Sequence, residues 1–511
     1  MTSATVCTKA VVPQLALVLL SVAAGCANTS SGAVDARGPS TDGGARDAVP
    51  LFDVARRDGS APDAAGPAIP NYRGVFARAA SGLYAAFPSS VAVDGVGNTY
   101  LTGAFAGTGT LGSFVLSAPY DPETLFVAKL DAQGRPLWVR QTTGAHRSAG
   151  SAIAVSPDGR AIYVAGGFIG EATLGAYAVK SVPAPPTVPD VLPDDMLLAE
   201  LSPDGEVRWL KRFGGDAEEW PRALAVTREG DLILGGSCSS TAHFDAERVV
   251  SAGSSDICVA RLSPTGQVRW VVRGGGPNTD LLTSLAVGPS GGVYLGGQFY
   301  GEARLGPQSL LGQGAYDGFV AKLSPAGDFL WARGFGGAGS YDEARAVALD
   351  AHEEALFMTG RFSEQMVVGS TRLKCSGLQD LVLARFSAGD GRPEWAVAVG
   401  GPAADAGNGL VVGASGALFV TGTFEEMLVH GPATLNAVGA EDLLLGAFTL
   451  DGKLAWLRSA GGLGNDGGYA LASGPGKALH LAGQFRGTLV LDGTTLVSPG
   501  LNFFAWKLLP E

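Results

Sequence analysis

Acidic residues recur at one position of a repeated pattern, where they could bind a divalent cation or a basic ligand. They stand four residues before the small residue that opens a short apolar run, and converging carboxylates would focus a negative potential there. Each could instead cap its own turn by accepting backbone N–H groups, and the sequence favours this second interpretation. Ala86 and Ser148 take the position in two repeats. The acidic members are Glu219, Asp280, Asp342, Asp405 and Asp466.

Three large side chains beside these acids break the repeated pattern. Trp220 and Arg222 follow Glu219, and Tyr341 precedes Asp342. Aromatic residues and arginine dominate the energetics of recognition surfaces. We therefore predict a binding rim made of these three residues and the five acids, with a protein or a polysaccharide as the partner. Whether the rim holds a metal is left open, and no other cofactor is predicted.

The motifs that resemble enzyme signatures have a simpler explanation. The G-x-S-x-G match at 288–292 falls in a hairpin turn, without the strand-to-helix turn that a nucleophile elbow needs. The G-x-G-x-x-G match at 107–112 is not followed by a helix. The five histidines form no zinc motif. We predict a protein that is not an enzyme, with a hydrolase or lyase that uses the rim acids as the weaker alternative.

Five cysteines are present, and two of them occupy apolar positions of the repeat. Cys238 stands where other repeats have Phe, and Cys258 stands where Phe126 and Phe319 stand. They could form a disulfide in an exported protein, or they could be two small unbridged core residues. The sequence favours the unbridged pair.

A long internal repeat must position these residues. Six tryptophans share one sequence context, at spacings of 71, 61, 61, 64 and 61 residues, and each follows a short alternating run such as FVAKL at 319–323. After each Trp come a Gly-rich turn and two further β-rich runs joined by a hairpin signal. Four strands per repeat are expected. The tryptophans are Trp138, Trp209, Trp270, Trp331, Trp395 and Trp456.

The two ends of the repeat region complete each other. The last alternating run, FFAWKL at 503–508, lacks a following Trp run, and the first run, VFAR at 75–78, has Phe76 in the Trp position. An array that closes on itself leaves no exposed sheet edge. The sequence therefore predicts an all-β chain: a seven-bladed β-propeller with four-stranded blades over 71–511, its last blade closed by the N-terminal strand. One Trp per blade is interpreted as packing between blades.

These phrases resemble the seven-bladed propeller repeats called SBBP. The resemblance covers residues 72–511 and rests on the FVAKL, Trp-FGG and hairpin phrases. It implies an envelope or secreted repeat protein and no fixed reaction.

The N-terminal region predicts export and a lipid anchor. A ten-residue apolar run at 15–24 is too short to span a bilayer and is typical of a secretory signal. The residues AAGC at 23–26 resemble the bacterial lipobox, which implies a signal peptide over 1–25 and lipid on Cys26. Residues 26–70 are rich in Ala, Gly, Asp and Pro and predict a disordered tether. Because position 27 is not Asp, the resemblance implies the outer membrane.

Composition excludes other classes. The net charge is −12 and the basic residues are scattered, so no nucleic-acid partner is expected. The predicted function is a monomeric envelope lipoprotein, attached to the membrane through Cys26, that displays its propeller as a non-catalytic binding module. A periplasmic scaffold for outer-membrane assembly is the alternative.

Overall fold

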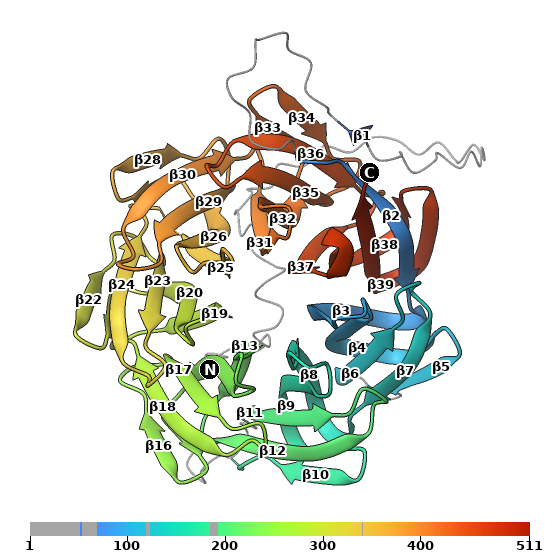
Figure 1. Cartoon of the computed structure of the whole chain (residues 1–511), viewed down its shortest axis with the longest axis vertical. Coiled ribbons are helices and arrows are strands. Elements are labelled where there is room, and N and C mark those ends of the chain that lie inside the picture. The colour runs from blue at the N-terminus through green and yellow to red at the C-terminus, as the bar shows by residue number, and fades with distance from the viewer. Residues whose placement is uncertain (1–51, 54–68, 119–122, 184–192, 340) are drawn as a thin grey trace, which may run out of the picture. The chain divides into compact units, whose positions relative to one another are not determined.

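The apolar runs and their Gly-rich turns form β-strands, which group into antiparallel sheets around a common axis (Figure 1). The computed structural model describes residues 52–53, 69–118, 123–183, 193–339 and 341–511. The all-β class and the propeller architecture predicted from the sequence are confirmed. Cys26, the signal peptide and most of the tether lie outside the described residues.

Each blade contributes one strand to the ring around the axis and continues outward with a second strand. The innermost strands are β3 (Ser81–Val93), β8 (Thr143–Val155), β13 (Glu219–Val226), β19 (Asp280–Val287), β25 (Glu343–Leu349), β31 (Asp405–Gly413) and β37 (Gly467–Ser473). Their partners are β4 (Thr99–Leu111), β9 (Ile162–Leu174), β14 (Leu232–Cys238), β20 (Val293–Phe299), β26 (Ala355–Phe362), β32 (Ala417–Phe424) and β38 (Leu479–Leu491).

The third and fourth strands complete each blade. The third strands are β6 (Thr124–Leu130), β11 (Asp195–Leu201), β17 (Asp256–Leu262), β23 (Asp317–Leu323), β29 (Asp380–Ser387), β35 (Asp442–Thr449) and β39 (Thr494–Pro510). The outermost strands are β7 (Pro136–Gln141), β12 (Val207–Gly215), β18 (Val268–Gly274), β24 (Phe329–Phe335), β30 (Pro393–Val399), β36 (Leu454–Ala460) and β2 (Tyr72–Ala79). Because β2 pairs with β39, the start of the propeller supplies the outer strand of the blade that ends the chain.

Short hairpin strands lie between the second and third strands of several blades. Their strands are β5 (Phe114–Ala118), β10 (Tyr177–Lys180), β15 (Thr241–Phe244), β16 (Glu247–Val250), β21 (Glu302–Leu305), β22 (Gln308–Leu311), β27 (Gln365–Val368), β28 (Thr371–Lys374), β33 (Met427–His430) and β34 (Ala433–Asn436). A two-residue strand, β1 (Phe52–Asp53), pairs with β36. The one helical turn assigned in the described residues, η2 (Pro475–Lys477), joins β37 to β38.

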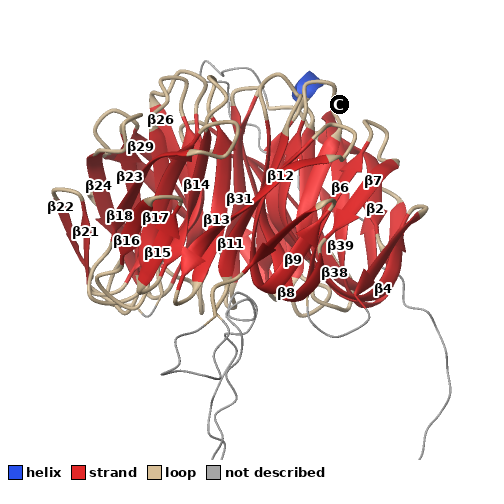
Figure 2. Cartoon of the chain, turned by 90° about the horizontal axis from the view of Figure 1, so that it is seen from below, coloured by secondary structure: helices blue, strands red, loops and turns tan. Residues whose placement is uncertain are grey.

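Strand direction alternates within a blade, so the connections divide between two faces. Loops from an outer strand to the next inner strand, and from a second strand to a third, share one face, which we call the mouth face. The opposite face carries the tight hairpins and η2, which Figure 2 shows at the top. The five predicted rim acids, Trp220 and Tyr341 stand at or next to strand ends on the mouth face.

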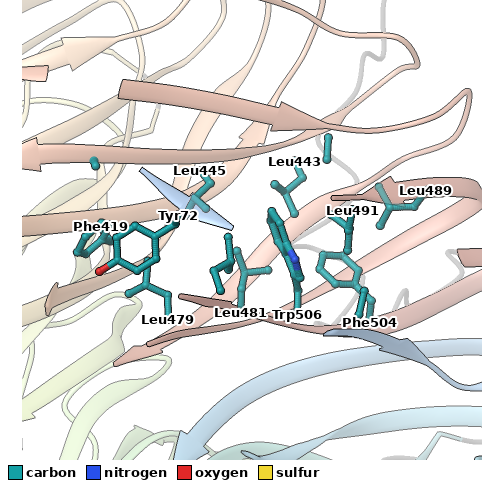
Figure 3. Close-up of a cluster of buried hydrophobic side chains, with 14 of the residues drawn as sticks. Tyr72, Phe419, Leu443, Leu445, Leu479, Leu481, Leu489, Leu491, Phe504 and Trp506 are labelled. Carbon is teal, nitrogen blue, oxygen red and sulfur yellow. The ribbon is translucent and has the colours of Figure 1, made fainter. Parts of the chain in front are cut away.

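The hydrophobic core lies between adjacent blades rather than in one central mass. Each buried cluster draws side chains from neighbouring blades, and Figure 3 shows the cluster in which Tyr72 of β2 and Trp506 of β39 meet Leu443 and Leu445 of β35. The tryptophan indole N–H groups add hydrogen bonds across the same boundaries: Trp138 donates to Pro203 O at 2.9 Å, and Trp456 donates to Pro70 O at 3.2 Å. Such contacts fit the packing interpretation of the Trp position.

A disulfide joins the second and third strands of one blade. Cys238 of β14 and Cys258 of β17 are both buried, with their Cα atoms 5.9 Å apart. The unbridged interpretation that the sequence favoured is therefore wrong. Cross-strand neighbours cannot be identified before the register of β14 on β17 is known, which is why the sequence left this open.

Removing this disulfide should destabilise the chain. The bridge closes a loop with a sequence separation of 20, for which loop entropy gives about 3 kcal/mol. We expect the double variant Cys238→Ala and Cys258→Ala to lower the free energy of unfolding by about that amount in urea titrations without reductant. Cys375→Ala, which removes a buried free thiol, is the matched control and should cost less. Equal losses in both variants would contradict the assignment.

Candidate functional site

The five acids of the predicted rim are buried inside their own blades. Each is at most 1% exposed and accepts a backbone N–H from the Gly-Gly turn just before it. Gly215 donates to Glu219 Oε2 at 2.7 Å, and Gly401 donates to Asp405 Oδ2 at 2.6 Å. The other three bonds join Gly276 to Asp280, Gly337 to Asp342, and Gly462 to Asp466. These are the contacts of turn caps, so the five acids do not form an exposed binding rim.

A second buried carboxylate faces each of these caps. A Cβ on Gly214 would lie 2.2 Å from Asp195 Oδ1 and 3.0 Å from Glu219 Oε2, so both acids meet at this glycine, whose φ is +147°. The second acid accepts N–H groups from the preceding loop, as when Val182 donates to Asp195 Oδ2 at 2.8 Å. The second acids are Asp195, Asp256, Asp317, Asp380 and Asp442.

Burial, assisted by the neighbouring carboxylate, raises the pKa of the capping acids. The pKa of Glu219 rises to about 9, that of Asp405 to about 8, those of Asp342 and Asp466 to about 7, and that of Asp280 to about 6. At pH 7 Glu219 and Asp405 therefore stay largely protonated, and a protonated acid is a weak ligand for a cation. Within the described ranges, no group of three or more His, Cys, Asp or Glu side chains is arranged to hold a metal ion.

A β-bulge interrupts every innermost strand at the same place. In each case one residue, three positions after the capping position, has no partner on the second strand, and bulges re-aim the side chain that they carry. These residues are exposed or partly exposed, although most of their neighbours are buried, and they belong to the innermost strands, which surround the axis in Figure 1. We call them the bulge ring: Ser89, Ser151, Arg222, Thr283, Arg345, Asn408 and Tyr469.

Three bulge-ring residues, Thr283, Arg345 and Asn408, each make a hydrogen bond to the next blade. The Thr283 hydroxyl donates to Ala344 O on the next blade, and Arg345 donates to Asn408 Oδ1 at 2.5 Å. Asn408 Nδ2 then donates to Gly468 O at 3.0 Å, beside Tyr469. This half of the ring is therefore closed by its own contacts.

Glu343 anchors the arginines of this closed half. Its Oε1 lies 2.5 Å from Arg345 Nε and 2.8 Å from Arg361 Nε. Burial alone would raise the pKa of Glu343, but the two guanidinium groups hold it below its ordinary value. Arg361 also donates to Gln379 Oε1 at 2.9 Å and lies 4.7 Å from the centre of the Tyr341 ring.

Arg222 contrasts with Arg345. Among the described residues its guanidinium has neither a hydrogen bond nor an ion pair, and burial lowers its pKa, with Glu218, Glu343 and Tyr341 opposing this effect and Arg147 adding to it. Arg147 already pairs with Glu123 at 3.2 Å and with Asp194 at 3.1 Å. The structure thus leaves one half-buried cation near the axis without a bonded acceptor.

The predicted rim aromatics separate into a buried and an accessible set. Trp220 is only 6% exposed, because its ring lies against Gly167 of the preceding blade and under the Arg147 guanidinium, 4.9 Å from the ring centre; its prediction as a rim contact is wrong. Tyr341 is partly exposed and begins a row of three tyrosine rings. The ring centroids of Tyr341 and Tyr316 are 5.3 Å apart, and those of Tyr316 and Tyr300 are 5.4 Å apart.

Arg222 was predicted from the sequence as a rim residue, but the shared position that it occupies in every repeat was not. Counting three residues on from each capping position yields the whole bulge ring, and these seven residues differ in chemistry while most other positions of the repeat stay alike. That variability was the available signal.

The fold and the bulge ring define the class of protein: an all-β propeller with a polar ring around its axis. No protein-family model matches the chain. A curated relative, the regulatory protein FlaEY of Caulobacter vibrioides, is 24% identical over 316 residues, which are 57% of this chain. The match spans only 33% of that relative's length.

Solved structures with similar folds have low identity. A europium-containing methanol dehydrogenase is 13% identical with a TM-score of 0.41, over 86% of this chain and 93% of the other. The Pan2 WD40 domain of Neurospora crassa is 10% identical with a TM-score of 0.41, over 82% and 88%. At these values the likenesses carry no argument about function. No helix in the described part of the chain is long and apolar enough to cross a membrane.

Proposed function

We propose that this chain is an envelope lipoprotein, anchored by lipid on Cys26, whose propeller is a non-catalytic binding module for a polysaccharide or protein partner at the mouth face. The observation that carries the binding proposal is the bulge ring. A repeated frame that places seven side chains of differing chemistry at equivalent positions around one axis provides a surface for recognition.

Two further features support the envelope location. The N-terminal signal and the AAGC segment at 23–26 resemble those of bacterial lipoproteins. A disulfide such as Cys238–Cys258 persists in oxidising compartments and is rare in the cytosol. The repeats resemble the SBBP family, which implies the same setting.

The anchor is tested by labelling cells with a palmitate analogue. We expect label on the parent chain and none on Cys26→Ala, while Cys7→Ala, which changes a cysteine inside the proposed signal, should keep the label. Protease treatment of intact cells then distinguishes the two orientations. Digestion of the propeller favours surface binding, and protection until the outer membrane is permeabilised favours the periplasmic assembly scaffold. Equal label on Cys26→Ala would contradict the lipoprotein proposal.

Binding is tested independently of the anchor. The chain, with residues 1–26 replaced by a cleavable secretory signal, is run through native gels that contain single neutral or acidic polysaccharides. Retardation by any one of them supports the binding module. A protein partner is tested with a photoreactive group at position 84, because the native Tyr84 is 75% exposed on the mouth face. If no polysaccharide retards the chain and no envelope protein crosslinks to it, the binding module is contradicted.

A further inference from the structure

Three positions on the mouth face differ in chemistry from repeat to repeat, although the buried acids beside them recur in most blades. One follows the Phe that most second strands share, one precedes the second acid, and one precedes the capping acid of the next blade. The last two meet at each boundary between blades. Glu123 and Arg147 form an ion pair at one boundary, whereas Ser255 and Thr279 form a β-bridge at another. Variable positions on a constant frame are candidates for recognition.

Tyrosine fills all three positions at one boundary. Tyr300 follows β20, Tyr316 precedes β23, and Tyr341 lies just before β25 on the next blade. The chain has 11 tyrosines, and no other repeat has one at any of these positions. We call these three residues the tyrosine sector.

Hydrogen bonds to backbone carbonyls hold the tyrosine sector together. Asp342 N donates to Tyr316 O at 2.9 Å across the boundary, and Asn278 Nδ2 donates to Tyr300 O at 3.1 Å. The three rings are in contact as a row. Tyr300 is 42% exposed, and Tyr316 and Tyr341 are partly exposed, so a ligand on the mouth face can reach the row.

The Tyr341 side chain is positioned by its own neighbours. Gln298 Nε2 donates to its hydroxyl at 3.3 Å, and the Arg361 guanidinium lies 4.7 Å from its ring centre. Glu343 holds Arg361 at 2.8 Å and supplies its counter-charge. A side chain that is ordered in advance loses little entropy on binding, so its contacts contribute more fully to affinity.

The matching positions on either side of the tyrosine sector carry no charge. The boundary before it has Ser255 and Thr279, and the boundary after it has Gln379 and Ala404. A charged ligand gains no counter-charge at these positions. Hydroxyl and amide side chains can instead pair with the hydroxyls of a neutral sugar.

The size of the tyrosine sector favours a small ligand over a protein. An aromatic side chain buries about 150–250 Å², and these three are less than half exposed, so together they offer at most roughly 300 Å². A stable protein interface buries about 800 Å² on each partner. A short stretch of saccharide matches the smaller area.

We infer that the tyrosine sector binds a neutral saccharide, whose C–H faces pack on the rings of Tyr300, Tyr316 and Tyr341. Tyrosine suits such a ligand because its ring is apolar and its hydroxyl forms hydrogen bonds. This inference rests on the proposed binding function and names the ligand class and its place on the mouth face.

The experiment is calorimetric titration of the full chain, with residues 1–26 replaced by a cleavable signal, with hexasaccharides from cellulose, xylan, mannan, starch and chitin. We expect at least one of these neutral sugars to bind. Its affinity should be the same at low and high salt, because no charge pair forms. No binding by any of the five, or an affinity that falls steeply with salt, would overturn the inference.

Variants locate the site. Tyr300→Ala should weaken binding of that hexasaccharide about tenfold, and Tyr300→Phe should bind nearly as the parent does because it keeps the ring. Tyr177→Ala is the matched control, since Tyr177 is 40% exposed on β10 of another blade, and it should bind as the parent does. Full affinity in Tyr300→Ala, or an equal loss in both alanine variants, contradicts the assignment.

Hydroxyl-radical footprinting tests the same surface without a substitution. The bound hexasaccharide should protect Tyr300, Tyr316 and Tyr341 from oxidation and leave Tyr177 as reactive as in the free chain. Equal oxidation of the tyrosine sector with and without sugar counts against the site. If the hexasaccharides fail while an acidic polysaccharide still retards Tyr300→Ala, or an envelope protein still crosslinks to it from position 84, the binding module stands and the saccharide assignment is removed.

Discussion

Replacing Glu343 with Gln should lower the free energy of unfolding by about 3–5 kcal/mol, the cost of breaking a buried ion pair by removing one partner. Glu343 is 6% exposed and is the shared acceptor of Arg345 and Arg361. A neutral amide leaves two adjacent guanidinium groups without their counter-charge. The midpoint of urea unfolding, compared with the parent at pH 7, measures the loss.

Glu394 provides the matched control on the same blade. Its carboxylate also receives two arginines, Arg385 at 2.8 Å and Arg392 at 3.3 Å, but on the accessible outer strand β30. Solvent screens such pairs, so Glu394→Gln should cost less than about 1 kcal/mol. If the two substitutions cost the same, Glu343 is not the anchor of the closed half of the bulge ring.

The repeated frame could be predicted from the sequence because each strand carries its own signal. The alternating run, the Trp position and the hairpin residues are local patterns, and repetition reinforces each one. The closure of β2 on β39 followed from the same reasoning, since Phe76 and the run at 503–508 each lacked a complement.

The site could not be predicted in the same way, because it depends on pairing between strands. A bulge exists only relative to the partner strand, so nothing local marks Arg222 or Tyr469 as unpaired. Trp220 failed as a prediction for a related reason: its burial requires Gly167 on the neighbouring blade, where a Cβ would lie 2.3 Å from the indole ring. That contact appears only once the blades are packed.

Glu219→Gln should make the chain more stable than the parent at pH 8 and nearly equal to it at pH 4. The pKa of Glu219 is raised from 4.5 to about 9 by burial and by Asp195, so the native state keeps its proton where the unfolded state has lost it. The stability that this proton contributes is complete below about pH 4.5 and is lost as pH rises toward 9, by about 1.4 kcal/mol per pH unit. Glutamine cannot ionise, so it removes that loss.

Urea titrations at pH 4, 6 and 8 measure this difference, with Glu218→Gln as the adjacent control. Glu218 is only half-buried, and its substitution leaves the buried Glu219 cap in place. The raised carboxylates of the other blades, and His480 with its pKa lowered to about 3, titrate alike in parent and variants, so their contributions cancel in the difference. The amide introduced by Glu219→Gln can also donate toward the unpaired Asp195 Oδ1, which adds to the gain at pH 8. A Glu219→Gln curve parallel to that of the parent would show that the capping acid is ionised in the folded blade.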